Sequence, residues 1–275
     1  PLALGSDTAG SVRNPASACG IVGWKPAYDA LPRDGIFPLA WSLDHVGLLA
    51  RHVDDMAIAA AVLGLPTTPA PITGLRIGFV RHWHEADMPA TPDVAAALNH
   101  VASSLVRAGA TVTGITLPHL EQFNLVNRLI LQSEGFAIHA SNLRDHPERF
   151  SKLTRAALLT GAFTTAETLL AAYRLQRQLT TAVERAFDEV DVLLTASSMT
   201  PPCRIDDPAE IARTYLMQAR SPFNVTGHAA LAMASGVSAD GLPLSVQFAA
   251  RTDATLFAAA TAWEQAMGGP PTPSI

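Results

Sequence analysis

The chain has 275 residues, of which 48% are hydrophobic and 16% are charged, and its formal net charge is −5. This apolar content can fill a large buried core, which excludes a disordered chain. No run of like charges provides an electrostatic footprint, so nucleic-acid binding is not expected as the main role.

The first predicted feature is a glycine-rich loop. Four glycines lie within the first 23 residues, around a short polar run, which is typical of a loop whose backbone approaches another group closely. A compact, turn-rich segment is predicted to continue to about Gly47. Apolar residues then recur at helical spacing over residues 51–65, and Gly64 and Pro66 end this predicted helix.

A strand, a helix and a second strand are predicted next. LRIGFV, residues 75–80, is typical of a buried strand. Pro92 stands at the first position of a helix that continues to Gly109, and TVTGITL, residues 111–117, follows as a strand. This order indicates a βαβ unit and therefore the α/β class.

The rest of the chain is predicted to be mostly helical. The pattern over residues 122–190 is almost entirely helical, and residues 254–267 are expected to form a closing helix. Residues 191–197 and 243–250 are predicted as buried strands. We find no internal repeat and no clear linker, so we expect a single domain over residues 1–275.

The segment GSDTAGSVRNPAS, residues 5–17, is the candidate site. It packs small residues around serines and a threonine, so several backbone N–H groups can converge there, which is the composition of an anion or oxyanion site. It is not a Walker loop, because no Gly-Lys-Ser/Thr follows, and no Gly-x-Ser-x-Gly nucleophile elbow surrounds Ser6 or Ser11. A plain structural turn is the alternative interpretation.

Residues 1–55 contain GSDTAGSVRNPASACGIVGWKPAYDALPRDGIFPLAWSLDHVGLLARHVDD, which resembles the core of the amidase signature family. FDEVDVLLTASSMTPP and SPFNVTGHAALAMASGVSADGLPLSVQFAAR resemble its C-terminal part, so the resemblance spans nearly the whole chain and is weakest over residues 120–180. The resemblance implies a mixed β-sheet core covered by helices. It also implies a serine hydrolase that acts on carboxamides through a Ser, cis-Ser, Lys triad, without a cofactor.

The resemblance assigns roles to individual residues of the loop. Ser11 matches the nucleophile, whose hydroxyl would attack the amide carbonyl and form an acyl-enzyme. Asp7 and Arg13 match charged positions that hold the loop. The backbone N–H groups that match the oxyanion hole, where each donor is typically worth about 3–4 kcal/mol, are those of Thr8, Ala9, Gly10 and Ser11. Ala9 stands where the family more often has glycine.

The base of this triad has no match in the sequence. In the family, the catalytic Lys and the cis-Ser lie upstream of the segment matched by residues 5–17, and here only PLAL precedes it. The two lysines, Lys25 and Lys152, match neither position. We therefore expect the chain to be the C-terminal part of an amidase, inactive or nearly so by itself unless the missing segment is supplied, because a free serine hydroxyl is a weak nucleophile.

Other polar residues are interpreted as structural. His45, in SLDHVG, is not expected to replace the missing base, and His228 is expected to pack rather than to line the acyl pocket. RHWHEAD, residues 81–87, superficially resembles a metal site, but alternate residues after a strand are usually solvated, so no metal is predicted. Five apolar side chains are candidate pocket walls: Phe37, Trp41, Tyr215, Met217 and Phe223.

The expected location is cytoplasmic and the expected substrate is a small molecule. The two cysteines, Cys19 and Cys203, have no metal-ligand spacing and suit a reducing compartment. Charges and prolines interrupt the apolar stretches, so no membrane association is expected. Because Asp7 and Arg13 are the only charges close to Ser11 in sequence, a neutral amide is favoured over a strongly charged one.

Three functions remain open from the sequence. The first is an amidase that hydrolyses a carboxamide C–N bond. The second is a glutaminyl-tRNA amidotransferase-like subunit that hydrolyses glutamine and passes ammonia to a partner chain. The third is a non-catalytic fragment or pseudoenzyme that binds a partner, and either a homodimer or a complementing chain is a candidate assembly.

Overall fold

The computed structural model describes residues 2–66 and 71–270. Within them, one sheet contains eight strands in the order β1-β3-β2-β7-β8-β6-β4-β5. The strands are β1 (Leu2–Asp7), β2 (Val22–Lys25), β3 (His45–Ala50), β4 (Arg76–Phe79), β5 (Thr111–Gly114), β6 (Val192–Ala196), β7 (Ala229–Val237) and β8 (Pro243–Ala250). The helices are α1 (Arg13–Cys19), α2 (Val53–Val62), α3 (Pro92–Arg107), α4 (Leu120–Asp145), α5 (Lys152–Leu159), α6 (Ala166–Glu189), α7 (Pro208–Thr214), α8 (Pro222–Val225) and α9 (Asp253–Met267). Three shorter helical turns are η1 (Trp83–Asp87), η2 (Pro147–Arg149) and η3 (Thr160–Phe163).

The sheet is mixed. Neighbouring strands are antiparallel from β1 through β6, whereas β4 pairs in parallel with both β6 and β5. The parallel part contains the βαβ unit β4-α3-β5, as the sequence predicts. The α/β class is therefore confirmed, and the sheet is the mixed, helix-covered one that the sequence implies.

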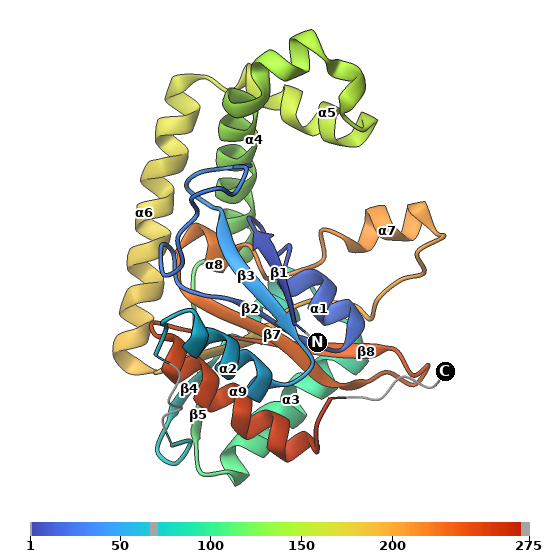
Figure 1. Cartoon of the computed structure of the whole chain (residues 1–275). Helices are drawn as coiled ribbons and strands as arrows, with labels where there is room; N and C mark the ends of the chain where they lie inside the picture. Colours follow the sequence, from blue (N-terminus) through green and yellow to red (C-terminus); the bar gives the residue numbers. More distant parts are fainter. Residues whose placement is uncertain (1, 67–70, 271–275) are drawn as a thin grey trace.

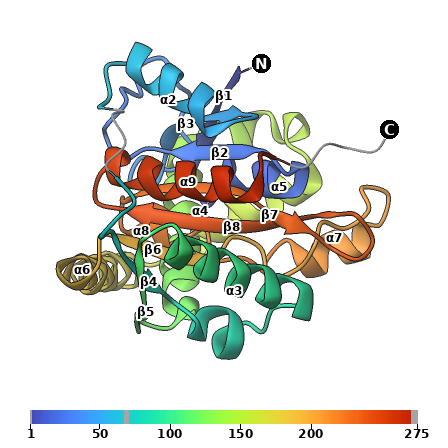
Figure 2. The same ribbon diagram turned by 90° about the horizontal axis from the view of Figure 1, so that it is seen from below.

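Helices cover both faces of the sheet. On β2, Trp24 contacts Phe257 of α9, with ring centroids 5.2 Å apart, whereas Gly23 faces Ala16 of α1. Because successive strand residues point to opposite faces, α1 and α9 lie on opposite sides. In Figure 2, α9 and α3 lie in front of the central strands.

The longest helices extend away from the sheet. Figure 1 shows α4 and α6 side by side, with α5 at their far end. At the start of α6, the Thr165 hydroxyl caps the helix by accepting the N–H of Thr168. No helix of residues 2–66 and 71–270 is both long enough and apolar enough to cross a bilayer.

The loop interpretation of the first 23 residues is wrong for much of that segment, which contains β1, α1 and the start of β2, and Gly47 lies in β3; residues 26–44 form turns and bends, as predicted. The glycines there are strand positions that permit close packing, not only loop positions. A Cβ added to Gly23 would lie 2.5 Å from the Cβ of Ala16, and one added to Gly47 would lie 2.8 Å from the carbonyl oxygen of Trp24. Glycine therefore lets α1 and neighbouring backbone lie against these strands.

Two further elements differ from the sequence analysis. β7, AALAMASGV, is buried along most of its length at the centre of the sheet, but alanine and glycine are weak strand formers. α7 lies in a stretch for which the sequence analysis gives no helix; its N-cap, Asp207, accepts the N–H of Glu210. The other predicted helices and strands are found close to their expected bounds.

Candidate active site

The candidate nucleophile lies in the turn between β1 and α1. Asp7 is the last residue of β1 and Arg13 is the first of α1. Gly10 has a φ of +113°, which L side chains rarely adopt. A Cβ on Gly10 would also lie 2.7 Å from the Cβ of Arg220. The turn therefore requires glycine at this position for two independent reasons.

The carboxylate of Asp7 organises the turn from within. It is fully buried and accepts the N–H groups of Gly10 at 2.8 Å and Val12 at 3.2 Å. It also accepts the N–H of Arg13 at 3.4 Å. Backbone donors at the start of a helix have no intrahelical partner, so this carboxylate satisfies groups that would otherwise be unpaired.

Arg13 attaches the turn to the rest of the fold. Its Nε lies 3.0 Å from Asp7 Oδ2 and its Nη2 lies 2.9 Å from Asp7 Oδ1, a two-point ion pair between fully buried side chains. Its remaining donors reach the Gln247 Oε1 at 2.7 Å, the Asn224 Oδ1 at 2.6 Å and the Arg220 carbonyl at 2.8 Å. Burial alone would raise the pKa of Asp7, but the Arg13 guanidinium holds it well below its usual range.

Thr8 anchors the other side of the turn. Its hydroxyl donates to Asp44 Oδ1 at 2.6 Å, and its carbonyl accepts the amide of Asn127 at 3.1 Å. The other oxygen of Asp44 accepts the N–H of Leu39 at 2.8 Å. The turn is therefore fixed to β1, α1, α4 and the loop before β3.

Ser11 stands on the outside of this fixed turn. Its side chain is exposed, and in the described part of the chain its hydroxyl forms no hydrogen bond. Of the four expected oxyanion donors, the Gly10 N–H already donates to Asp7. Those of Thr8, Ala9 and Ser11 have no hydrogen-bonding partner among residues 2–66 and 71–270. The turn thus presents a free hydroxyl beside unused backbone donors.

Neither lysine contacts Ser11. The ammonium of Lys25 is buried and donates to the carbonyls of His228 at 2.7 Å and Pro26 at 3.1 Å. Burial and the charge of Arg13 lower the pKa of Lys25 well below its usual value. Lys152 is the first residue of α5, at the far end of α4.

The two histidines considered from sequence also point elsewhere. His45 Nδ1 lies 2.7 Å from the carbonyl oxygen of Leu43, its Nε2 has no partner in the described residues, and burial lowers its pKa. His228 Nε2 lies 2.8 Å from Glu184 Oε1. Neither imidazole is bonded to Ser11, so within residues 2–66 and 71–270 no general base is in place.

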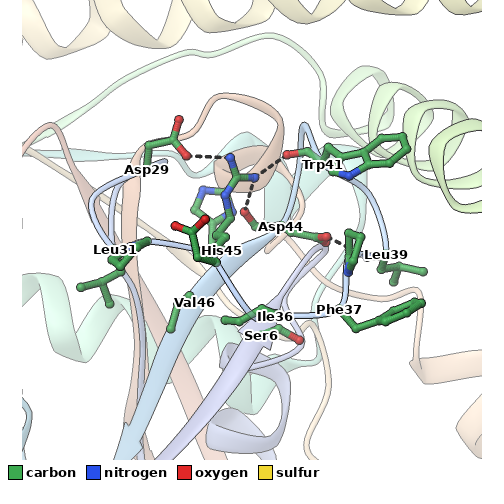
Figure 3. A pocket seen from close by; sticks show the side chains of 14 residues that line it. Ser6, Asp29, Leu31, Ile36, Phe37, Leu39, Trp41, Asp44, His45 and Val46 are labelled. Atoms are coloured by element: carbon green, nitrogen blue, oxygen red, sulfur yellow. Dashed lines mark hydrogen bonds and ion pairs between the residues drawn. The ribbon is translucent and has the colours of Figure 1, made fainter. Parts of the chain in front are cut away.

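A first cavity of about 550 Å³ lies beside the turn (Figure 3). Ser6, His45 and Asp44 contribute to its wall, and the predicted pocket residues Phe37 and Trp41 line it as expected. Asp44 belongs both to this wall and to the hydrogen bond that holds Thr8. The cavity beside the turn is therefore large enough for a small-molecule substrate.

A second cavity of about 160 Å³ lies along α1 on the other side of Gly10. Its wall contains the predicted pocket residue Tyr215, together with Asn14, Ser17, Ser198 and the side chain of Arg220. The last two predicted pocket residues line neither cavity. Phe223 is fully buried, and Met217 packs against the core.

In the described residues, no group of three or more His, Cys, Asp or Glu side chains is arranged to hold a metal ion. In the RHWHEAD segment, His84 is buried and stacked on Phe79, with ring centroids 5.4 Å apart. His82 Nε2 lies 3.1 Å from the carbonyl oxygen of Leu117. These two histidines are close in sequence, but they do not form a set of metal ligands in the fold.

Several residues that define the site were not singled out from the sequence. They are Asp44, Asn127, Arg220, Asn224 and Gln247. A usable signal exists for Gln247, a polar residue inside the apolar strand PLSVQFAA. The others lie in loops or helices whose local pattern carries no such signal.

Comparisons with known proteins agree on one family. The family model Amidase matches residues 1–255. A 2-amino-5-chloromuconic acid deaminase of Comamonas testosteroni is 34% identical, over 97% of this chain and 61% of that protein. A glutamyl-tRNA(Gln) amidotransferase subunit of Roseiflexus castenholzii is 33% identical, over 91% of this chain and 59% of that protein.

Solved structures show the same likeness. The crystal structure of an amidase superposes with a TM-score of 0.86 at 27% identity, over 97% of this chain and 62% of that chain. A 6-aminohexanoate cyclic dimer hydrolase complexed with substrate superposes with a TM-score of 0.82 at 26% identity, over 97% and 64%. The chain thus spans about three-fifths of the length of these relatives.

Proposed function

Because this chain belongs to the amidase family, we propose that it takes part in hydrolysis of a carboxamide C–N bond, with Ser11 as the nucleophile. The observation that carries the proposal is the exposed, unbonded hydroxyl of Ser11 on a turn whose backbone is fixed by the buried Asp7–Arg13 pair. A rigid turn of this kind holds the attacking oxygen and the stabilising donors in one geometry.

The chemistry follows from the groups on the turn. The Ser11 oxygen attacks the amide carbonyl, and the carbonyl oxygen gains negative charge in the tetrahedral intermediate. We assign the oxyanion hole to the N–H groups of Thr8, Ala9, Gly10 and Ser11, with Gly10 shared because it already donates to Asp7. Collapse of the intermediate expels the amine and leaves an acyl-enzyme, which water then hydrolyses.

The proton of Ser11 needs an acceptor. No titratable side chain of residues 2–66 and 71–270 is hydrogen-bonded to it. We propose that a Lys and a cis-Ser relay come from a segment equivalent to the part of the relatives that this chain does not match, in the same polypeptide or in a complementing chain. The 275-residue chain alone then has little or no activity.

A fluorophosphonate serine probe tests this proposal. The chain is labelled alone and after co-expression with the part of the Comamonas testosteroni relative that precedes its matched region, and intact mass and peptide mapping locate the label. We expect labelling at Ser11 only in the co-expressed sample, none in Ser11→Ala, and unchanged labelling in Ser103→Ala, which removes an exposed serine of α3. Absence of Ser11 labelling in every sample would support the non-catalytic fragment instead.

The amidotransferase-like alternative is favoured by one observation. Several similar proteins, at 28–33% identity, are named as subunits of a glutamyl-tRNA(Gln) amidotransferase. Ammonia release from glutamine, compared with release from simple aliphatic amides in the co-expressed sample, separates the two functions. Strong preference for glutamine would favour the amidotransferase-like role.

A further inference from the structure

Arg220 is a buried cation that leaves three of its five N–H donors unused in the described residues, one on Nε and two on Nη2. Its side chain is 3% exposed, and Nη1 donates to the Ser198 hydroxyl at 2.7 Å and to the Ser197 carbonyl at 3.0 Å. Nε has no partner in the described residues, and Nη2 forms no hydrogen bond there either. Nε is enclosed and faces Gly10, so Nη2 is the nitrogen left to bind a ligand, and a guanidinium N–H forms a strong hydrogen bond with a carboxylate.

The neighbouring Arg13 differs from Arg220 because its guanidinium has hydrogen-bonding partners for all its nitrogens. Its Nε, Nη1 and Nη2 all donate, and Asp7 neutralises its charge. The groups that Arg220 contacts are a carbonyl and a hydroxyl, which carry no charge. Burial and the nearby Arg13 lower the pKa of Arg220 to about 9, so it remains a cation at neutral pH. A buried cation without a counterion is costly, and an anionic ligand would offset that cost.

Arg220 lines the second cavity, the one of about 160 Å³ along α1. Hydroxyl, amide and thiol groups from Asn14, Ser17, Ser198 and Cys203 share its wall. Among the described residues of this wall, Arg220 is the only charged one, so no carboxylate there competes for Nη2. The cavity thus combines one fixed positive charge with neutral donors.

This cavity lies beside the candidate nucleophile. Gly10, the residue before Ser11, packs on the Arg220 side chain so closely that an added Cβ would lie 2.8 Å from Cδ and 2.9 Å from Nε. Asn14 of the cavity wall follows Ser11 by one turn of chain. A group bound at Arg220 would therefore lie next to the turn that carries Ser11.

We propose that this cavity binds a carboxylate on the acid part of the substrate, held by Nη2 of Arg220, so that the substrate is a monoamide of a short dicarboxylic acid. The proposal rests on Ser11 being the nucleophile. A cavity of about 150 Å³ holds a benzene-sized molecule, and a carboxylate with three methylene groups is of similar size. Glutaramate is a suitable probe, and glutaramide is its neutral isostere.

Calorimetric titration of the full 275-residue chain as Ser11→Ala tests this without turnover. We expect glutaramate to bind about tenfold or more tightly than glutaramide, since bonds to a charged group are among the stronger ones. Adding Arg220→Gln should remove this preference, whereas Arg204→Gln, which removes an exposed cation paired with Asp206, should keep it. Equal binding of both compounds, or no binding of glutaramate, would overturn the proposal.

A second measurement avoids the risk that Arg220→Gln fails to fold. Cys203 lines the cavity, whereas Cys19 is exposed on α1 outside its wall. In the unsubstituted chain, glutaramate should slow modification of Cys203 by methyl methanethiosulfonate, glutaramide should not, and Cys19 should react equally in both cases. Unprotected Cys203 at saturating glutaramate would contradict the proposal. Failure of the fluorophosphonate test would refute the role of Ser11 while leaving these binding results valid.

Discussion

Asp7→Asn is the sharpest test of how the turn is held. The Asp7 oxygens accept hydrogen bonds from backbone N–H groups of Gly10, Val12 and Arg13 and from side-chain donors of Arg13 and Asn224. Each oxygen receives three of these six bonds, so the NH2 group of asparagine faces three donors in either orientation. The substitution also leaves the buried Arg13 without its counterion.

The magnitude follows from burial. Both side chains of the pair are completely buried, and removing one partner of a buried ion pair costs about 3–5 kcal/mol. For a protein of this size, about 1 kcal/mol corresponds to roughly 2–4 °C, so we expect the Tm at pH 7 to fall by about 6–20 °C. Circular dichroism during thermal and urea unfolding measures this difference.

Asp206→Asn is the matched control, because it makes the same change in an exposed pair with Arg204. We expect no measurable change in its Tm. Because the pKa of Asp7 is lower in the folded chain, its stabilisation is complete above the unfolded value of about 3.9 and is lost as pH falls below it. The difference in Tm between the unsubstituted chain and Asp7→Asn should therefore be smaller at pH 3 than at pH 7. A Tm decrease at pH 7 no larger than that of Asp206→Asn would refute the reasoning.

Three further changes have defined outcomes. Gly10→Ala places a Cβ 2.7 Å from Arg220 at a φ of +113°, so it should destabilise the chain and abolish Ser11 labelling in the co-expressed sample. Gly35→Ala is the control, because Gly35 also has a positive φ but has nothing within 4 Å of an added Cβ. It should lower the free energy of unfolding by only about 1–2 kcal/mol in urea and leave labelling unchanged. His84 is buried, and neither ring nitrogen has a hydrogen-bonding partner in the described residues; Nε2 lies 3.9 Å from Glu85 Oε1, but burial still lowers the pKa of His84. The unfolded chain therefore gains this proton first, and stability should decrease from about pH 7 to pH 5. His84→Leu should make that decrease smaller, and an unchanged pH dependence would contradict this. Ala9→Gly should leave the rate of Ser11 labelling within about twofold, because the backbone donor is kept, and a large change would show that the Ala9 side chain matters.

The sequence located most helices because their signals are local. Proline at the start of α3 and the repeated apolar face up to Gly109 define that helix without any knowledge of its neighbours. Strands rich in glycine or alanine carry no such signal. β7 became a central strand because β2 and β8 pair with it on either side, and those partners lie far away in sequence.

The same distinction between local signals and contacts of distant segments applies to the site. By itself, the sequence determined the glycine-rich turn and the class of the fold, because each depends on continuous stretches of chain, and its family resemblance suggested Ser11 as the nucleophile. Only the tertiary structure placed Gln247 and Asn224 on Arg13, and only it placed the charge of Arg220 against Gly10. The sequence favoured a neutral amide because it showed only the charges adjacent along the chain, whereas a cavity's charge depends on which distant side chains folding brings to its wall.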